Sequence, residues 1–123
     1  MWEYYNPNPS ARNVHDCSVR AVAKALNISW EDAYILIADA GLNINDMPSA
    51  NAVWGAVLRQ HGFRRFIVPN RCPDGYTIKD FCREHPRGIY VIGTDGHVLT
   101  AIDGVYYDSW NSGNECPLFY WTI

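Results

Sequence analysis

Two Asp-Gly pairs in the last third of the chain constrain the fold more than any other feature. Asp95-Gly96 and Asp103-Gly104 each separate two runs of strand-forming residues. Asp-Gly is typical of two-residue β-hairpin turns, because both residues tolerate positive φ angles. The sequence therefore predicts a meander of strands. Its expected ranges are 88–94, 97–102, 105–110 and 118–123.

The segment before this meander carries helix signals instead. Residues 16–26 place apolar side chains at helical spacing, and Asp16 stands at the N-cap position. A second helix is expected to begin after Ser29, where Ser-Trp-Glu-Asp resembles a capping box. It is expected to run to Ala40, with Gly41 ending it.

The remaining elements follow from the same signals. Helices are expected over 51–60 and 77–85, and a strand over 63–69. Residues 1–12 contain two prolines and are expected to be irregular. Helices followed by a strand meander define an α+β fold, with N-terminal helices packed on a C-terminal antiparallel sheet. At 123 residues we expect one domain, 1–123.

Charge and hydropathy argue against two classes of partner. Thirteen acidic residues against ten basic ones leave no basic footprint for a nucleic acid. The short cluster of Arg59, Arg64, Arg65 and Arg71 is interpreted as a solvated face. No apolar run approaches the roughly 18 residues of a membrane span, and no signal peptide is visible at the start. We therefore expect a cytoplasmic protein that binds neither nucleic acid nor membrane.

The four cysteines are Cys17, Cys72, Cys82 and Cys116. Without a secretory signal they are interpreted as thiols in a reducing compartment, with a Cys72–Cys82 disulfide as the alternative for an exported protein. Cys82-x-x-His85 alone is a weak zinc signal, and no Cys-x-x-Cys is present. We expect no metal and no cofactor.

The parity of the last hairpin brings three functional side chains together. If 103–104 is a two-residue turn, His97 lies opposite Trp110 and diagonal to Asp108 on one face. Asn111 then has the opposite parity. The carboxylate of Asp108 is placed to orient the imidazole of His97. The alternative is a half-buried structural histidine whose N–H donates to Asp108 and that has no role in catalysis.

Cys17 is expected in the first turn of its helix, where free N–H groups and the helix dipole stabilise an anion. Such a position lowers the pKa of a thiol, and the thiolate is the nucleophile. Cys82 falls on an apolar helix face and is expected in the core. The alternative for Cys17 is a small hydrophobic residue that fills a helix start.

This order of Cys, His and Asp resembles the papain-like cysteine peptidases, in which an early helix carries the nucleophile and packs on a sheet that carries the base. The chain is most similar to small bacterial and phage-encoded proteins of this kind. It shares with them the motifs Asp16-Cys17-Ser18-Val19-Arg20-Ala21, Trp30-Glu31, His97-Val98, Asp103-Gly104 and Tyr107-Asp108-Ser109-Trp110. The resemblance implies a nucleophile at Cys17, a base at His97, an orienting carboxylate at Asp108 and a shielding indole at Trp110.

The chain also departs from the papain pattern. Ala11 stands where papain-like enzymes commonly carry an oxyanion-hole Gln. Asn13 is a candidate to donate instead, together with the Cys17 backbone N–H; the alternative is a turn or cap residue. Arg20 is expected in an internal salt bridge, or else on a substrate carboxylate. The short chain leaves little room for a second lobe, which favours a short or flexible substrate.

The expected activity is that of a peptidase or amidase that acts on a peptide or protein through an acyl-enzyme. Two alternatives remain. One is an acyltransferase or transglutaminase-like enzyme that uses the same three residues with an amine as acceptor. The other is a binding module that keeps the fold without catalysis.

Overall fold

The computed structural model describes all 123 residues and has an α+β fold. The helices are α1 (Cys17–Leu26), α2 (Trp30–Ile44), α3 (Asn51–Gln60) and α4 (Ile78–Glu84), with a 3₁₀ turn at Cys72–Asp74. The strands are β1 (Trp2–Tyr4), β2 (Arg64–Ile67), β3 (Ile89–Thr94), β4 (His97–Ile102), β5 (Val105–Asp108) and β6 (Phe119–Thr122). The predicted order of helices and strands is therefore confirmed from residue 17 onward.

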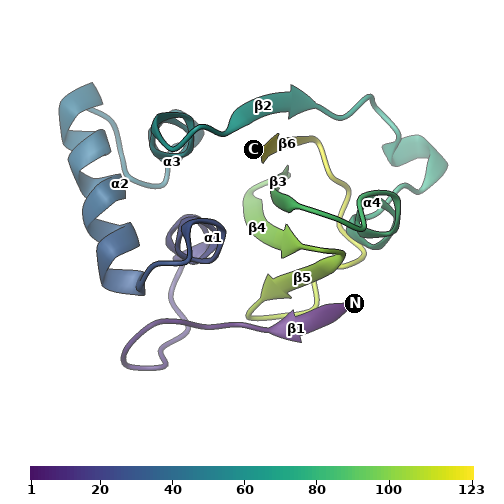
Figure 1. Ribbon diagram of the computed structural model, residues 1–123, viewed down its shortest axis with the longest axis horizontal. Helices are drawn as coiled ribbons and strands as arrows, with labels where there is room; N and C mark the ends of the chain where they lie inside the picture. The colour runs from purple at the N-terminus through teal and green to yellow at the C-terminus, as the bar shows by residue number, and fades with distance from the viewer.

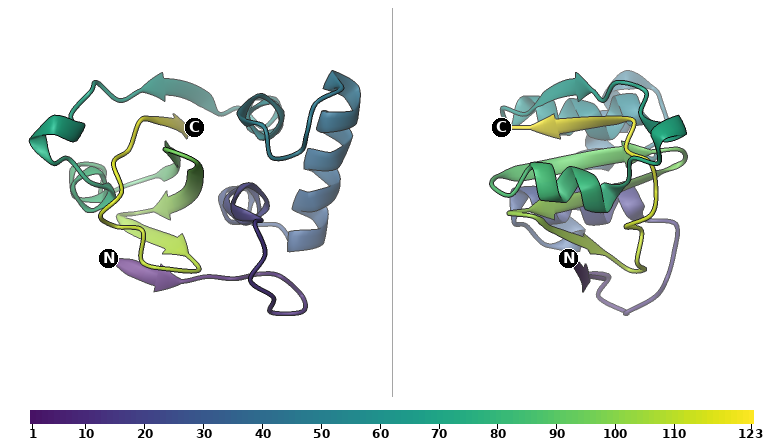
Figure 2. Two further views of the ribbon diagram at one scale, coloured as in Figure 1. Left: turned by 180° about the vertical axis from the view of Figure 1, so that it is seen from behind. Right: turned by 90° about the vertical axis from the view of Figure 1, so that its right-hand side faces the viewer.

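The six strands form one sheet that separates two helical layers. The strand order is β1-β5-β4-β3-β6-β2, and the right-hand view of Figure 2 crosses it from β2 at the top to β1 at the bottom. Helices α1, α2 and α3 lie on one side of the sheet and α4 lies on the other (Figure 1). No helix of the chain is both long and apolar enough to cross a membrane.

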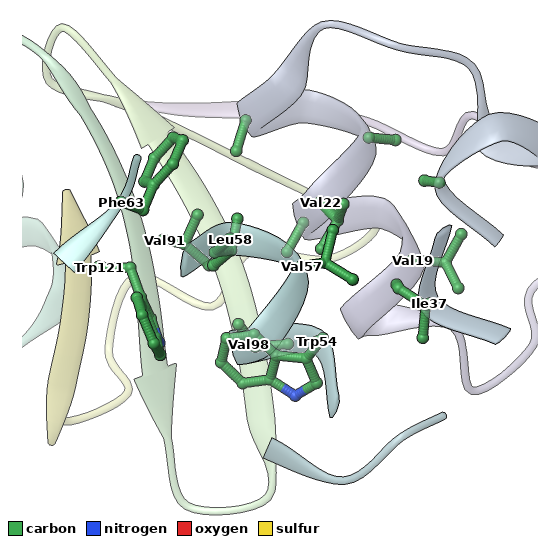
Figure 3. Packing of buried hydrophobic residues seen from close by; sticks show 14 of the residues in the cluster. Val19, Val22, Ile37, Trp54, Val57, Leu58, Phe63, Val91, Val98 and Trp121 are labelled. Carbon is green, nitrogen blue, oxygen red and sulfur yellow. The ribbon is translucent and has the colours of Figure 1, made fainter. Parts of the chain in front are cut away.

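Each side of the sheet has its own hydrophobic core. The larger core joins the three N-terminal helices to the sheet, and Figure 3 shows Trp54 and Leu58 of α3 facing Trp121 of β6 and Val91 of β3. The smaller core lies under α4 and includes Phe81, Cys82, Leu99 and Tyr106. Cys82 is buried, as predicted.

The last hairpin forms with the predicted register. Asp103 and Gly104 have φ angles of 50° and 82°, both positive as a type I′ turn requires. Ile102 pairs with Val105 and Thr100 with Tyr107. The strand ends at Asp108 rather than at residue 110, so Trp110 lies just beyond the paired region.

Three sequence predictions were wrong at the level of elements. Residues 1–12 are not wholly irregular, since β1 forms there and pairs with β5 in parallel. The sheet is consequently mixed and not purely antiparallel. Helix α2 does not stop at Gly41 but runs to Ile44, and Asn45 ends it with a left-handed φ of 61°.

The prediction of four free thiols was also wrong, as was the alternative pairing. Cys72 forms a disulfide with Cys116, which links the 3₁₀ turn to the segment before β6. Cys17 and Cys82 remain free. Cys17 and Cys82 are therefore the two reduced cysteines. Cys17 is half-buried, whereas Cys82 is buried.

Candidate active site

Cys17 is the first residue of α1 and is half-buried. Asp16 occupies the N-cap position, as predicted, but its carboxylate makes no capping hydrogen bond. It instead accepts from the Arg20 guanidinium and, at 2.8 Å, from the Trp30 indole. The N–H groups of the first turn are therefore left without a side-chain acceptor beside the Cys17 thiol.

His97 is the first residue of β4 and lies between Asp108 and Cys17. Its Nε2 is 2.6 Å from Asp108 Oδ2, so the diagonal pairing predicted from strand parity is confirmed. The hydrogen bond to a carboxylate makes Nε2 the donor and leaves Nδ1 for the thiol.

The imidazole and the thiol change each other's pKa. Burial raises the pKa of Cys17, but the hydrogen bond and charge of His97, the Val98 N–H and the charge of Arg20 outweigh it, so the pKa falls below its ordinary value. Burial lowers the pKa of His97, but its bonds to Asp108 and Cys17 raise it to about 9. At a pH between the pKa of Cys17 and the pKa of His97, the favoured state is a thiolate beside an imidazolium.

Asp108 is 1% exposed and accepts from four donors. Oδ2 accepts from His97 and from Ser112 Oγ at 2.7 Å. Oδ1 accepts from Arg20 Nη2 at 3.1 Å and from the Ser109 N–H at 2.9 Å. Burial raises the pKa of Asp108, yet the hydrogen bonds of His97 and Ser112 and the charges of His97 and Arg20 hold it below its ordinary value. The buried carboxylate is therefore ionised and fixed in orientation.

Strand β1, which was not predicted, holds the backbone of Asp108 in place. The indole of Trp2 donates to the Asp108 carbonyl at 3.2 Å, and the Tyr5 N–H donates to it at 2.9 Å. This contribution was not predicted, because β1 is only three residues long and all its side chains are exposed, so it has no buried face.

Arg20 connects Asp108 to the start of α1. Its guanidinium bridges the carboxylates of Asp16 and Asp108, and all three side chains are buried. The internal salt bridge expected for Arg20 is thus present, and it has two partners. The network joins Cys17's helix to the strand that carries Asp108.

We expect Arg20→Ala to lower the free energy of unfolding by about 3–5 kcal/mol, because it leaves two buried carboxylates without their cation. Arg83→Ala is the matched control: its pair with Asp80 is largely exposed and should contribute under about 1 kcal/mol. Urea denaturation of both variants measures the difference. Equal and small losses would contradict a structural role for the Arg20 bridge.

The other candidate residues surround the site. The Trp110 ring lies 5.1 Å from the His97 ring, centre to centre, and is 45% exposed, so it covers one side of the imidazole. Asn13 is exposed and makes no side-chain hydrogen bond within the protein, which leaves its amide free. Asn111 is directed elsewhere: its Oδ1 accepts from the Tyr106 hydroxyl at 2.7 Å.

These groups open onto a pocket of about 500 Å³, within the range of small-molecule and peptide clefts. Its walls are the loop before α1, the start of α3, the turn between β3 and β4, and the segment after β5. The lining residues include Asn13, Cys17, Asn51, Trp54, Thr94, His97 and Trp110. Asp108 is absent from the lining, so it acts on a ligand only through His97.

The chain offers no cluster of three or more His, Cys, Asp or Glu residues that could hold a metal ion. Comparisons with known proteins return nothing: no family model, no curated protein and no solved structure matches this chain.

Proposed function

We propose that this protein is a cysteine-dependent peptidase or amidase with a minimal papain-like fold, acting on peptides or proteins through Cys17, His97 and Asp108. The observation that carries the proposal is the polarised pair at the helix start. A thiol with a lowered pKa faces an imidazole whose pKa is about 9, and a buried carboxylate holds that imidazole by its other nitrogen. A merely structural histidine does not need a thiol on its free nitrogen.

The proposed reaction passes through a thioester. The Cys17 thiolate attacks the amide carbonyl carbon, and a C–S bond forms. His97 Nδ1–H gives its proton to the departing nitrogen, the C–N bond breaks and the amine leaves. Water then attacks the thioester while Nδ1 takes its proton, the C–S bond breaks, and the acid and the thiolate are regenerated.

In the proposed reaction, two groups stabilise the oxyanion of each tetrahedral intermediate. The Cys17 backbone N–H lies in the first turn of α1. The Asn13 side chain lines the same pocket with no partner inside the protein. Donors of this kind are each worth about a hundredfold or more in rate when they are aimed at the developing charge.

The pH profile of Cys17 alkylation tests the proposal. We expect two steps in the rate of reaction with iodoacetamide. The first lies below the ordinary pKa of a thiol, where the thiolate–imidazolium pair forms. The second lies near pH 9, where His97 loses its proton and the thiolate is no longer paired. Mass-spectrometric mapping of limiting reagent over pH gives both steps.

Cys82 is the internal control for this measurement. Burial raises its pKa to about 11, so it should stay unlabelled until the protein unfolds. Cys72 and Cys116 should stay unlabelled until their disulfide is reduced. A single step near the ordinary thiol pKa at Cys17 would contradict the proposal and favour a non-catalytic module.

We retain a cytoplasmic location as part of the proposal. The Cys72–Cys116 disulfide weighs against it, since such bonds are rare in a reducing compartment. Trapping thiols with a membrane-permeant alkylating agent before lysis tests this point. Free Cys72 and Cys116 support the cytoplasm, and an oxidised pair supports an exported protein.

A further inference from the structure

A second, smaller pocket of about 250 Å³ lies beside the candidate active site. It is formed by α3, β2 and β6. Its lining residues are Asn51, Ala52, Gly55, Arg59, Arg65, Phe119 and Trp121. Both arginines are exposed, and no acidic residue contributes to the lining. We call it the Arg59–Arg65 pocket.

Its two guanidinium groups are held in place but have no anionic partner. Arg59 lies over the Trp121 ring at 5.1 Å and Arg65 over the Phe119 ring at 4.4 Å, measured to the ring centres. Neither takes part in any salt bridge or side-chain hydrogen bond of the protein. Stacking on a ring occupies the face of a guanidinium and leaves its N–H donors free at the edge.

The indole of Trp121 adds to this excess of donors. Trp121 is 3% exposed, and its Nε1 has no acceptor within the protein. Trp121 also pairs across the sheet with Arg65. One small pocket thus contains two unpaired cations and a residue with an unpaired N–H, and the protein provides no acceptor for any of them.

The Arg59–Arg65 pocket adjoins the pocket that holds Cys17. Asn51 lines both. Trp54 of the Cys17 pocket stacks on Phe119 of the Arg59–Arg65 pocket, with ring centres 6.1 Å apart. Figure 3 shows Trp54 and Trp121 in the same hydrophobic core. Asn51 and Arg59 stand at the two ends of α3, about 12 Å apart by helical rise. An extended peptide spans that distance in about four residues.

We propose that the Arg59–Arg65 pocket binds a carboxylate of the peptide substrate, about four residues beyond the part of the substrate that lies against Asn51 in the Cys17 pocket. This specificity rests on the proposed function, whereas carboxylate binding in the pocket does not. Two guanidinium edges match the planar, bidentate geometry of a carboxylate. These two unpaired cations give the pocket a local preference for negative charge, although the chain is acidic overall.

Thiol-reactive peptides test the proposal. We would compare iodoacetyl-tetraglutamate amide with iodoacetyl-tetraglutamine amide, measuring the rate at which each alkylates Cys17. In this step the thiolate forms a C–S bond with the iodoacetyl carbon and iodide leaves. The tetraglutamate reagent should react about tenfold faster, because hydrogen bonds to charged groups strengthen its binding. The ratio of the two rates cancels any change in the thiol itself.

Arg59→Gln/Arg65→Gln should bring this ratio close to one. Arg64→Gln is the control for a lost positive charge, since it removes one such charge from an exposed neighbour in β2 that does not line the pocket. It should keep the ratio. A ratio near one in the unmodified protein, or an equal loss in Arg64→Gln, would overturn the proposal.

Calorimetric titration of the Cys17→Ala variant with capped tetraglutamate separates this inference from the proposed function. Binding that disappears in Arg59→Gln/Arg65→Gln supports the pocket even if Cys17 proves unreactive. No binding overturns the pocket whatever Cys17 does. Inorganic phosphate is the competitor: if it displaces tetraglutamate at equal concentration, the pocket is a phosphate site and the peptide specificity is wrong.

Discussion

Replacing His97 by alanine is expected to slow the alkylation of Cys17 at pH 6 by about ten- to a hundredfold, since an ordinary thiol is almost wholly protonated there. His97 is the largest contributor that lowers the pKa of Cys17, through its hydrogen bond and its charge. Its own pKa of about 9 keeps it protonated at pH 6. Without it, only the Val98 N–H, the charge of Arg20 and the helix start favour the anion.

The matched control is His85→Ala. His85 stacks on Phe81 under α4 and lies outside the Cys17 pocket, so its loss should leave the reactivity of Cys17 unchanged. Thermal melting of both variants separates chemistry from folding. Unchanged reactivity in His97→Ala, or lost reactivity together with a collapsed melting transition, would favour a purely structural histidine.

The parts of the fold that sequence predicted depend on local signals. The Asp103-Gly104 turn fixed the hairpin register because only residues that tolerate positive φ fit a type I′ turn. Thr77 and Asp80 form the reciprocal capping box that begins α4. Such elements require only neighbours in the chain, so a single sequence specifies them.

The wrong predictions concern contacts between distant segments. Strand β1 exists because its backbone pairs with β5 about a hundred residues later, and no burial pattern marks it. The prediction at Gly41 failed for a more local reason, since the chain that turns at the end of α2 packs against this glycine: a Cβ there would lie 2.8 Å from the Asp46 carbonyl oxygen. In the sequence alone, a glycine that close packing requires cannot be distinguished from a glycine that ends a helix.

The candidate site, like the fold, was predicted where local signals sufficed and missed where distant segments meet. Strand parity predicted that His97 meets Asp108, and it does. Ser112 and Arg20 were not predicted as partners of Asp108. Ser112 reaches it only because the chain turns back after β5, and Arg20 only because α1 packs over β4. The sequence thus indicated the reacting groups but not the residues that hold them.

Three residues near His97 could orient its imidazole, namely Asp103, Asp108 and Asn111, and they differ in what they contact. Asp108→Ala should reduce the alkylation of Cys17 at pH 6 by about tenfold or more and turnover by orders of magnitude, as loss of an orienting carboxylate does. Asp108→Asn keeps an acceptor for His97 Nε2–H and should lose less. This comparison matters because Asp108→Ala also leaves Arg20 without one of its partners.

Asn111→Ala and Asp103→Asn are the controls. The Asn111 side chain accepts from Tyr106 and from the Gly113 N–H, so its loss should cost about 1 kcal/mol of stability and leave Cys17 reactive. Asp103 Oδ1 accepts from the Gly88 N–H in the turn, and asparagine retains that oxygen. Alkylation rates at pH 6 rank the variants. Full reactivity in Asp108→Ala with loss in Asn111→Ala would transfer the orienting role to Asn111, and the hydrogen bond between His97 and Asp108 would then be structural only.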